Sequence, residues 1–448
     1  MLTFIEDETL VSFIKAGLKI RMCYNSYKEC MTILNSRQWH NENHKIHFES
    51  GVRMGIGAFN LMISLLPARA IRLLEFIGFS GSKQVGLKEL ETGYKLNRSI
   101  RQILCVMTLL SYHLIVVHIL SHMEGNLEFC DEILRSQLQM YPDGVWFLFF
   151  KGRLEFMKGN IEDSITWYVR SWKSQDMWPQ FHHLCFWELM WTNSVKCEWR
   201  EASTYASRLL EESRWSRTIY SYQRAAFLSM LGDDIEAEEK TEIGNLMRNS
   251  SKWKQRIAGK SLPMEKFAIK KASRYFSQGN YLLLPALELL YVWNLFKVLG
   301  KKKQLVYNVY KIIEKALLNL NEQEEKTEYD ADNRGLVLLL KGVSLRHLHS
   351  PLQAEECLKT VISLEKKLKE DNYLVPYALV ELAFIYKEQG NVSKAYQILE
   401  EAKKNYTGYS LESRLHFKIH SFQAELDEKK LVSVNIFNLF QFIDRKGS

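Results

Sequence analysis

One short phrase recurs along this chain and limits its fold more than any other feature. It is a Gly-Asn pair, then an aliphatic residue, then a small residue three positions later, and it begins at Gly125, Gly159 and Gly390. A glycine that ends a helix in the left-handed region, followed by a short turn and a helix whose first inward position is small, is typical of a helical hairpin. The first two copies lie 34 residues apart, and a fixed period of this length indicates a solenoid.

Weaker copies extend the series to seven turn positions, at residues 125, 159, 197, 232, 300, 349 and 390. The intervals between them are 34, 38, 35, 68, 49 and 41 residues. Cys197 and His349 replace the glycine in two of the weaker copies. Thirty-four residues is the period of the tetratricopeptide repeat, which consists of two helices. The sequence therefore predicts an all-α fold, an α-solenoid of tetratricopeptide-type helical hairpins.

The longest interval holds an acidic run, residues 233–242, and then a basic segment. This basic segment, Lys252 to Arg274, has eight Lys or Arg residues and one acid, Glu265, so it carries +7 of the net charge of +8. We expect these charges to interrupt the solenoid. The predicted organisation is an N-terminal helical region (1–100), tetratricopeptide-type repeats (101–232), a charged insert (233–280), C-terminal repeats (281–425) and a divergent apolar tail (426–448).

One stretch, Ile103 to Leu120, has eighteen residues without Asp, Glu, Lys or Arg, which reaches the lower limit for a transmembrane helix. It contains two histidines and lies where the first repeat needs a helix, so we interpret it as a buried solenoid helix, with a membrane span as the alternative. The seven cysteines are scattered without a CxxC pattern, and no secretory signal precedes them. We therefore expect reduced thiols in an intracellular, cytoplasmic protein, with a mitochondrial or other membrane surface as the second location.

Motifs for catalysis or metal binding are incomplete. Gly259-Lys260-Ser261 looks like the end of a phosphate-binding loop, but Lys254 stands where that loop needs a glycine, and no strand pattern precedes it. The groups His182 to Cys185 and His416 with His420 do not reach four ligands. No Ser/His/Asp set, cysteine dyad or carboxylate pair stands out. The sequence predicts a protein that is not an enzyme and has no cofactor and no metal.

The concave face of the predicted solenoid is a candidate site for a protein partner. In each repeat, fixed positions of the first helix line this face. Counting back from the turns places these residues there: Phe149, Arg153, Phe156, Trp187, Trp191 and Tyr222. Such a groove is apolar and aromatic, so it is either packed shut, which we favour, or occupied by an apolar partner.

The basic segment is a second candidate. Its residues Lys260, Lys266, Lys270, Lys271 and Arg274 are candidates for contact with an anionic surface, such as a membrane. Aromatic residues lie nearby, a mixture that also suits nucleic acid, but we consider nucleic-acid binding the least favoured function. A charge run is most often a solvated helical face, and the upstream acidic run offers a local counter-charge. We therefore favour a structural role for the basic segment over binding to an anionic surface and over binding to nucleic acid.

Several long stretches resemble the tetratricopeptide repeat protein 39 family, whose fungal relatives are an inclusion-body-clearance, mitochondrial outer-membrane group. These stretches are GIGAFNLMISLLPARAIRLLEFIGFSG (55–81), HHLCFWELMW (182–191), ESRWSRTIY (212–220), AGKSLPMEKFAIKK (258–271), LPALELLYVWN (284–294) and YSLESRLHFKIH (409–420). The resemblance covers about residues 2–425 and implies an all-α repeat scaffold without known catalytic residues. Family members have further helices before Leu2, and the tail after Glu425 departs from their pattern.

From this resemblance and the residues together we predict a non-enzymatic protein-interaction scaffold or adaptor. The alternative is a peripheral membrane or lipid-associated protein that uses the basic segment and the apolar groove. A solenoid needs terminal repeats with a polar outer face to stay soluble. Because both ends of this chain are apolar where the family pattern stops, we also expect self-association through uncapped ends.

Overall fold

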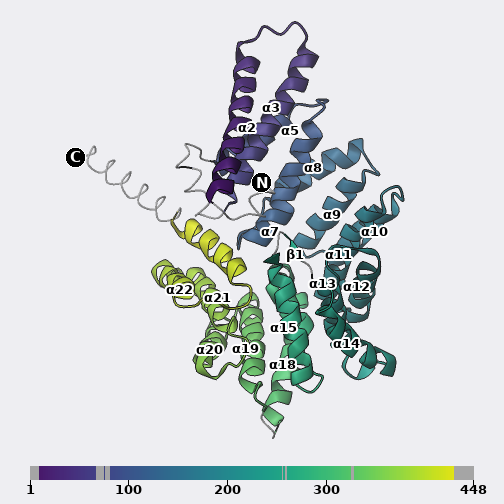
Figure 1. The fold of residues 1–448 in the computed structure, drawn as a ribbon, viewed down its shortest axis with the longest axis vertical. Helices are drawn as coiled ribbons and strands as arrows, with labels where there is room; N and C mark the ends of the chain where they lie inside the picture. Colours follow the sequence, from purple (N-terminus) through teal and green to yellow (C-terminus); the bar gives the residue numbers. More distant parts are fainter. Residues whose placement is uncertain are drawn as a thin grey trace, which may run out of the picture. The chain divides into compact units, whose positions relative to one another are not determined.

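The computed structural model describes residues 10–66, 75, 81–254, 256–257, 260–323 and 327–427 (Figure 1). These residues are almost wholly helical, which confirms the prediction of an all-α solenoid of helical hairpins. The only strands among them, β1 (Arg256–Ile257) and β2 (Lys260–Ser261), pair with each other. The chain forms two compact units. We call them the N-terminal unit (1–116, 128–133 and 257–260) and the main unit (117–127, 134–256 and 261–448).

The N-terminal unit is built from α2 (Leu10–Ser36), α3 (Glu42–Ser64), α5 (Lys83–Tyr94), α6 (Gln102–Ser111) and the π-helix η1 (Tyr112–Val116). Helices α3 and α5 approach each other closely because glycines meet at their contact. A Cβ atom on Gly86 would lie 2.7 Å from the backbone nitrogen of Leu61 and 2.9 Å from the carbonyl oxygen of Gly57. Any larger residue at Gly86 would therefore force the two backbones apart.

The apolar stretch identified in the sequence is helical, and it continues from α6 and η1 into α7 (Val117–Leu120). Among the described residues this segment, Gln102–Leu120, is long and apolar enough to cross a membrane by length and composition. Half of it is buried inside the structure. Both interpretations made from the sequence, a buried solenoid helix and a membrane span, stay predictions.

The main unit is a series of antiparallel helices. It begins with α8 (Leu127–Met140), whose residues 128–133 belong to the N-terminal unit. The helices that follow are α9 (Val145–Met157), α10 (Ile161–Lys173), α11 (Pro179–Val195), α12 (Trp199–Glu212), α13 (Arg217–Leu228), α14 (Ala237–Ser250), α15 (Pro263–Ser277), α16 (Pro285–Val292), α17 (Phe296–Leu299), α18 (Lys303–Glu322), α19 (Asp330–His347), α20 (Pro351–Ser363), α21 (Leu374–Glu388), α22 (Val392–Lys404) and a last helix over residues 412–427, with two short 3₁₀ turns, η2 (Gly232–Asp234) and η3 (Glu365–Lys367). Consecutive helices pack as hairpins, for example α9 with α10, α11 with α12, α19 with α20, and α21 with α22.

Four hairpin turns share one backbone geometry at the positions that the sequence period predicts. The residues at the turn have positive φ: Gly159 (76°), Cys197 (66°), His349 (59°) and Gly390 (81°). In each turn the next backbone N–H donates to the carbonyl five residues back, at 2.8 to 3.0 Å: Asn160 to Glu155, Glu198 to Asn193, Ser350 to Leu345 and Asn391 to Tyr386. This bond is the signature of a Schellman motif, and it satisfies the last carbonyls of the first helix. The predicted turns at Gly159 and Gly390 are confirmed.

Two predicted turn positions are wrong in detail. Gly300 has φ −61°, and Gly125 is not among the residues with positive φ. The left-handed residue after α16 is Asn294 (φ 64°), and the N–H of Leu295 donates to the carbonyl of Leu290 at 2.8 Å. The same motif is thus present six residues earlier than the glycine suggested, because Asn tolerates the left-handed region nearly as well as Gly does.

The acidic run begins a regular helix, although we expected an interruption of the solenoid here. Glu236 and Glu239 form a capping box at the start of α14, which satisfies backbone N–H groups at the helix N-terminus. Helix α14 packs against α13 as the second helix of a hairpin, and α15 packs on both. The acidic side chains pair with the preceding helices, as Glu242 does with Arg224 at 2.8 Å.

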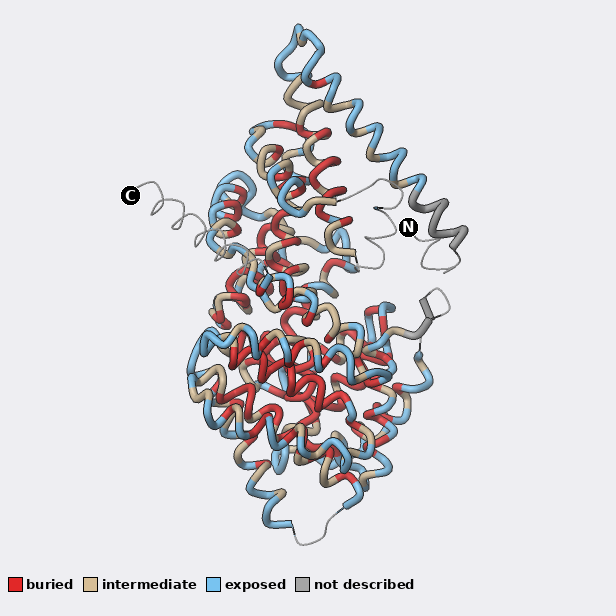
Figure 2. Tube along the Cα trace, turned by 90° about the vertical axis from the view of Figure 1, so that its left-hand side faces the viewer, coloured by how far each residue is buried: buried red, intermediate tan, exposed pale blue. Residues whose placement is uncertain are grey.

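Helix α16 occupies the interior of the main unit. All eight of its residues are buried, and it packs against α11, α13 and α19. Its one charged residue, Glu288, pairs with Lys271, and its other residues are apolar or aromatic, so this helix is stable only where protein surrounds it. Figure 2 shows the buried residues of this unit gathered inside and the exposed residues around the edge. The concave side of the hairpins from α11 onward is therefore filled by the chain itself.

Candidate functional site

The residues predicted to line a partner groove lie in the interior. Phe149, Arg153, Phe156, Trp191 and Tyr222 are each at most 5% exposed, and Trp187 is partly buried. The ring of Trp293, which follows α16, lies 5.1 Å from that of Trp187 and 5.6 Å from that of Trp191 between centroids. The ring of Trp293 thus packs against Trp187 and Trp191, and a groove packed shut, the alternative that the sequence favoured, stays our interpretation.

The one charged residue of this set is paired. The Arg153 guanidinium donates to Glu188 at 2.7 Å, and the hydroxyl of Tyr168 donates to the same carboxylate oxygen at 3.1 Å. Burial alone would lower the pKa of Arg153, but the charges and hydrogen bonds of Glu188 and Tyr168 together outweigh burial and raise the pKa. A buried pair of this kind is satisfied within the fold and offers nothing to a ligand.

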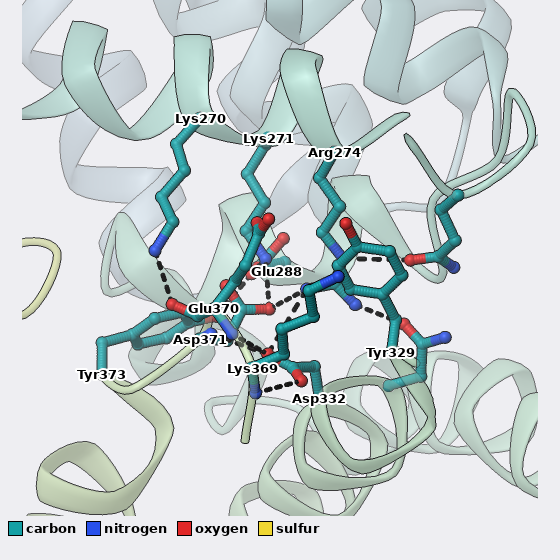
Figure 3. Close-up of polar contacts among 12 residues, drawn as sticks. Lys270, Lys271, Arg274, Glu288, Tyr329, Asp332, Lys369, Glu370, Asp371 and Tyr373 are labelled. Carbon is teal, nitrogen blue, oxygen red and sulfur yellow. Dashed lines mark hydrogen bonds and ion pairs between the residues drawn. The ribbon is translucent and has the colours of Figure 1, made fainter. Parts of the chain in front are cut away.

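The basic segment also turns inward at α15. Lys271 and Arg274 are each 3% exposed and form ion pairs with Asp371 (Figure 3). The Lys271 ammonium also lies 2.5 Å from a carboxylate oxygen of Glu288, which accepts from the hydroxyl of Tyr373 as well. Burial alone would raise the pKa of Asp371, but the positive charges of Lys271 and Arg274 outweigh it and lower the pKa.

The carboxylate of Asp332 completes this buried charged cluster. It accepts three backbone N–H groups, from Lys369, Glu370 and Asp371, at 2.7 to 2.9 Å. The Arg274 guanidinium reaches Asn333 on α19 at 2.6 Å. The cluster therefore joins α15 to α19 and to the loop before α21, and each of its charges has a partner inside the fold (Figure 3).

This placement corrects the interpretation of Lys271 and Arg274 as contacts for an anionic surface. Both charges are buried and neutralised, so they present nothing to an external surface. Lys266 and Lys270 are exposed, and Lys270 donates to the backbone carbonyl of Glu370. The side chain of Lys260 lies outside the described residues. Lys266 and Lys270 therefore remain as candidates for contact with an anionic surface.

A cavity of about 330 Å³ opens elsewhere in the main unit and was not identified from the sequence. It is bounded by residues from the segment before α8, from α16 to α18, from α19, from α21 and from the last helix. Its lining residues are His122, Glu124, Met157, Tyr291, Asn294, Phe296, Lys297, Gly300, Lys301, Val343, Arg346, His347, Glu381, Phe384, Lys387, Glu388 and Lys418. Charged side chains thus converge on it from several helices that are far apart in the sequence.

Glu381 is the central carboxylate of this cavity. It is 1% exposed and accepts from Arg346 and Lys418, at 3.1 Å each, and from the hydroxyl of Tyr291 at 3.2 Å. Burial alone would raise its pKa, but the charges of Lys418 and Arg346 outweigh burial and hold the pKa at about 2. Glu381 is therefore ionised at any physiological pH.

The two histidines of the cavity are neutral at pH 7. Burial lowers the pKa of His122 to about 4 despite its contact with Glu425, whose carboxylate lies 2.5 Å from Nε2. Burial and the charge of Arg346 lower the pKa of His347 to about 3. The positive charge around the cavity at neutral pH therefore comes from its lysines and its arginine.

Reactive groups of other kinds are not assembled. Within the described ranges, no group of three or more His, Cys, Asp or Glu side chains is placed to hold a metal ion. Burial raises the pKa of the Cys105 thiol to about 11 and those of Cys185 and Cys197 to about 12. Such thiols are protonated at neutral pH and are weak nucleophiles.

Comparison with known proteins decides the family. Residues 1–348 match the model of the family described as Iml2/Tetratricopeptide repeat protein 39. This chain belongs to that family. The Caenorhabditis elegans protein named Tetratricopeptide repeat protein ttc-39B is 38% identical to this member over 424 residues, which are 94% of this chain and 72% of that protein.

A solved structure, the tetratricopeptide repeat domain of P58(IPK), matches this family member at 13% identity, over 77% of this chain and 94% of that one. Its TM-score is 0.21, which is too low to support an argument. The hairpins themselves and the family assignment make this chain a tetratricopeptide-type repeat protein. Proteins built from such repeats present extended surfaces to other proteins.

Proposed function

We propose that this family member is a non-enzymatic protein-interaction scaffold, and that partners contact one edge of its repeat stack instead of the filled concave face. The supporting observation is a set of exposed apolar side chains in three successive connections between hairpins. Tyr141 lies between α8 and α9, Met177 and Trp178 lie between α10 and α11, and Trp215 lies between α12 and α13. We call these four residues the apolar edge.

All four side chains of the apolar edge are exposed. Met177 is 97% exposed, and the other three are 48 to 49% exposed. Single exposed apolar residues need no explanation, but large ones that recur at equivalent places in adjacent repeats indicate an interaction surface. Trp and Tyr are also the residues that dominate binding energy at protein interfaces.

The experiment compares the parent with a Met177→Ser/Trp178→Ser/Trp215→Ser variant by proximity labelling in cells and quantitative mass spectrometry. The matched control is Leu352→Ser, because Leu352 is 77% exposed but lies on α20, outside the apolar edge. We expect the triple variant to lose a defined subset of neighbours by more than fivefold, while the control keeps them. If the triple variant keeps every neighbour at equal melting temperature, the apolar edge is not the partner site.

The alternative function, peripheral membrane association through the basic segment, has weaker support. Only Lys266 and Lys270 among the proposed contacts are known to be exposed, and each charge near an anionic surface contributes about 1 kcal/mol. The apolar groove that was to assist it is filled by α16. We therefore rank this function second.

A further inference from the structure

The cavity of the main unit has more cations than carboxylates to neutralise them. Five cations and three carboxylates line it. The cations are Lys297, Lys301, Arg346, Lys387 and Lys418, and the carboxylates are Glu124, Glu381 and Glu388. A fourth carboxylate, Glu425, lies behind the wall and pairs with Lys387 at 2.7 Å. Even with Glu425 included, one positive charge is left over.

The ion pairs identify the residue without a partner. Glu124 pairs with Lys301 at 2.7 Å. Glu381 pairs with both Arg346 and Lys418, and Glu388 pairs with Arg346 at 3.1 Å. Among the residues that the structure describes, no carboxylate lies within ion-pair distance of Lys297, although the wall around Lys297 is crowded with cations.

Lys297 is nevertheless held in place. Its ammonium donates to the carbonyl oxygens of Ser121 at 3.1 Å and of Met123 at 2.8 Å. An ammonium has three hydrogens, so one of them has no acceptor in the described part of the chain. Burial, with the charges of Lys418 and Lys301, lowers the pKa of Lys297 to about 7, against the opposing effect of Glu124. A partly buried ammonium without a counter-ion is costly, and an anion in the cavity would reduce that cost.

We propose that this cavity binds a small molecule that carries a phosphate group, with Lys297 as the central contact and Lys301, Lys387 and Lys418 around it. A phosphate monoester carries a charge between −1.5 and −2 and three acceptor oxygens, so it can accept from several ammonium groups at once. Lysine is the compact point charge suited to this role. Arg346, whose planar fork suits a carboxylate, is already engaged by Glu381 and Glu388.

The size and the uncharged wall of the cavity fit a compact ligand. A volume of about 330 Å³ lies at the lower end of small-molecule sites. The uncharged part of the wall includes Met157, Phe296, Val343 and Phe384, which suit the carbon skeleton of a phosphorylated metabolite. The phosphate could belong to a free metabolite or to a lipid headgroup, and the two sources are separated by experiment.

Binding of the phosphate is coupled to protonation. The anion favours the charged form of Lys297, so binding draws a proton onto this lysine from solvent at pH 7.5 to 8. The other titratable or charged groups that face the cavity are His122, Glu124, Lys301, Arg346, His347, Glu381, Lys387, Glu388 and Lys418. Of these, His122, His347 and Glu381 have pKa values far below this window. We assign a proton taken up near pH 7.5 to Lys297, and the Lys297→Met variant tests this assignment.

The experiment titrates the purified full chain with pyrophosphate, soluble inositol trisphosphate and citrate by calorimetry, and with vesicles containing phosphatidylinositol bisphosphate by sedimentation. The variants are Lys297→Met and, on another helix, Lys418→Gln. Lys315→Met is the control, because it removes an exposed lysine of the same unit outside both the cavity and the basic segment. We expect the soluble phosphates to bind the parent and the control equally, and each cavity variant to bind at least tenfold more weakly. Citrate should bind the parent at least tenfold more weakly than pyrophosphate.

Further readouts separate this role from a structural one. In chloride buffer, Lys297→Met should melt no lower than the parent, since it removes an unpaired charge. In two buffers of different ionisation enthalpy at pH 7.5, the parent should take up a proton on binding and Lys297→Met should not. Soluble inositol trisphosphate binding more tightly than the vesicles identifies a free metabolite, and the reverse identifies a headgroup. The proposal would be overturned by any one of three results. These are no binding of any phosphate, equal binding by the parent and Lys297→Met, and binding of citrate as tight as that of pyrophosphate.

Discussion

Two groups of charged side chains in the main unit are made of the same residue types but differ in how their charges are balanced. In the buried charged cluster, Lys271 and Arg274 meet Glu288 and Asp371, and Asp332 pairs with Arg274 and accepts from three backbone N–H groups. In the cavity, five cations share four carboxylates, and Lys297 has backbone carbonyls as its acceptors. The cluster is closed, whereas the cavity is open and short of negative charge.

This difference indicates what each group does. A buried cluster whose charges are all paired fixes the relative positions of the elements that supply them, and it breaks only at a large cost. A cavity whose charges are incompletely paired retains electrostatic attraction for a ligand. We therefore assign the cluster to the fold and the cavity to binding, and we expect the loss of Asp371 to destabilise the protein and the loss of Lys297 to leave its stability unchanged.

The largest expected effect follows from breaking the buried charged cluster. Asp371→Ala removes a carboxylate that pairs with both Lys271 and Arg274, which leaves Lys271 with Glu288 and Arg274 with the more distant Asp332, at 4.0 Å. Removing one partner of a buried pair costs about 3 to 5 kcal/mol. Urea denaturation measures this loss directly.

The control for this measurement is Glu328→Gln, because Glu328 pairs with Lys369 at the surface and is 61% exposed. An exposed pair of this kind contributes about 1 kcal/mol or less to stability. Lys297→Met, measured beside both variants, should show no loss. An Asp371→Ala variant as stable as Glu328→Gln would contradict the division between a structural cluster and a binding cavity.

A smaller effect is expected at the hairpin turns. Gly159 and Gly390 share positive φ, so alanine at either position is strained by about 1 kcal/mol. Their surroundings differ: a Cβ atom on Gly159 would lie 2.7 Å from the Cβ of Lys301, whereas nothing lies within 4 Å of a Cβ on Gly390. We expect Gly159→Ala to cost about 2 kcal/mol and Gly390→Ala about 1 kcal/mol.

Titration with phosphate distinguishes the two variants further, because Lys301, which a side chain at position 159 would displace, lines the cavity. Gly159→Ala should weaken pyrophosphate binding by displacing Lys301, and Gly390→Ala should leave it unchanged. Thermal melting and calorimetry on the two variants provide both readouts. Equal melting temperatures for Gly159→Ala, Gly390→Ala and the parent would contradict the turn geometry itself.

The period of the sequence was enough to locate hairpin turns at Gly159, Cys197, His349 and Gly390, because a Schellman turn depends on local backbone geometry. It failed at Gly300 since the turn uses Asn294, and asparagine occurs too often to mark a turn by itself. Local patterns also cannot show that α16 fills the concave side, because that depends on how distant hairpins curve around it.

The charged sites show where sequence reasoning reaches its limit. The partners of Lys271 and Arg274 lie 17 to 100 residues away in the chain, so no local pattern pairs them. A usable signal did exist: both residues lie on the face of α15 that carries the buried Phe267, Ala268 and Tyr275. Lys297 gave a weaker signal, as a single lysine within the apolar stretch Phe296–Leu299. The shortage of carboxylates around it is visible only in three dimensions.

The smallest expected effect concerns the exposed remainder of the basic segment, which carries the alternative membrane function. The reversal Lys266→Glu/Lys270→Glu tests this function at the two exposed lysines and leaves the buried Lys271 and Arg274 in place, although Lys270 also donates to the carbonyl of Glu370 beside the cluster. If the segment serves an anionic membrane, the double variant should lose about 1 kcal/mol of vesicle affinity for each charge removed, with unchanged helicity. Sedimentation with anionic and neutral vesicles measures it, and Lys297→Met is the matched control because its lysine faces the cavity and not the exterior. Anionic vesicles that bind the double variant as tightly as the parent would exclude Lys266 and Lys270 as membrane contacts. If the vesicles instead bind the Lys297→Met variant more weakly than the parent, the contact lies at the cavity, as expected for a phosphorylated headgroup.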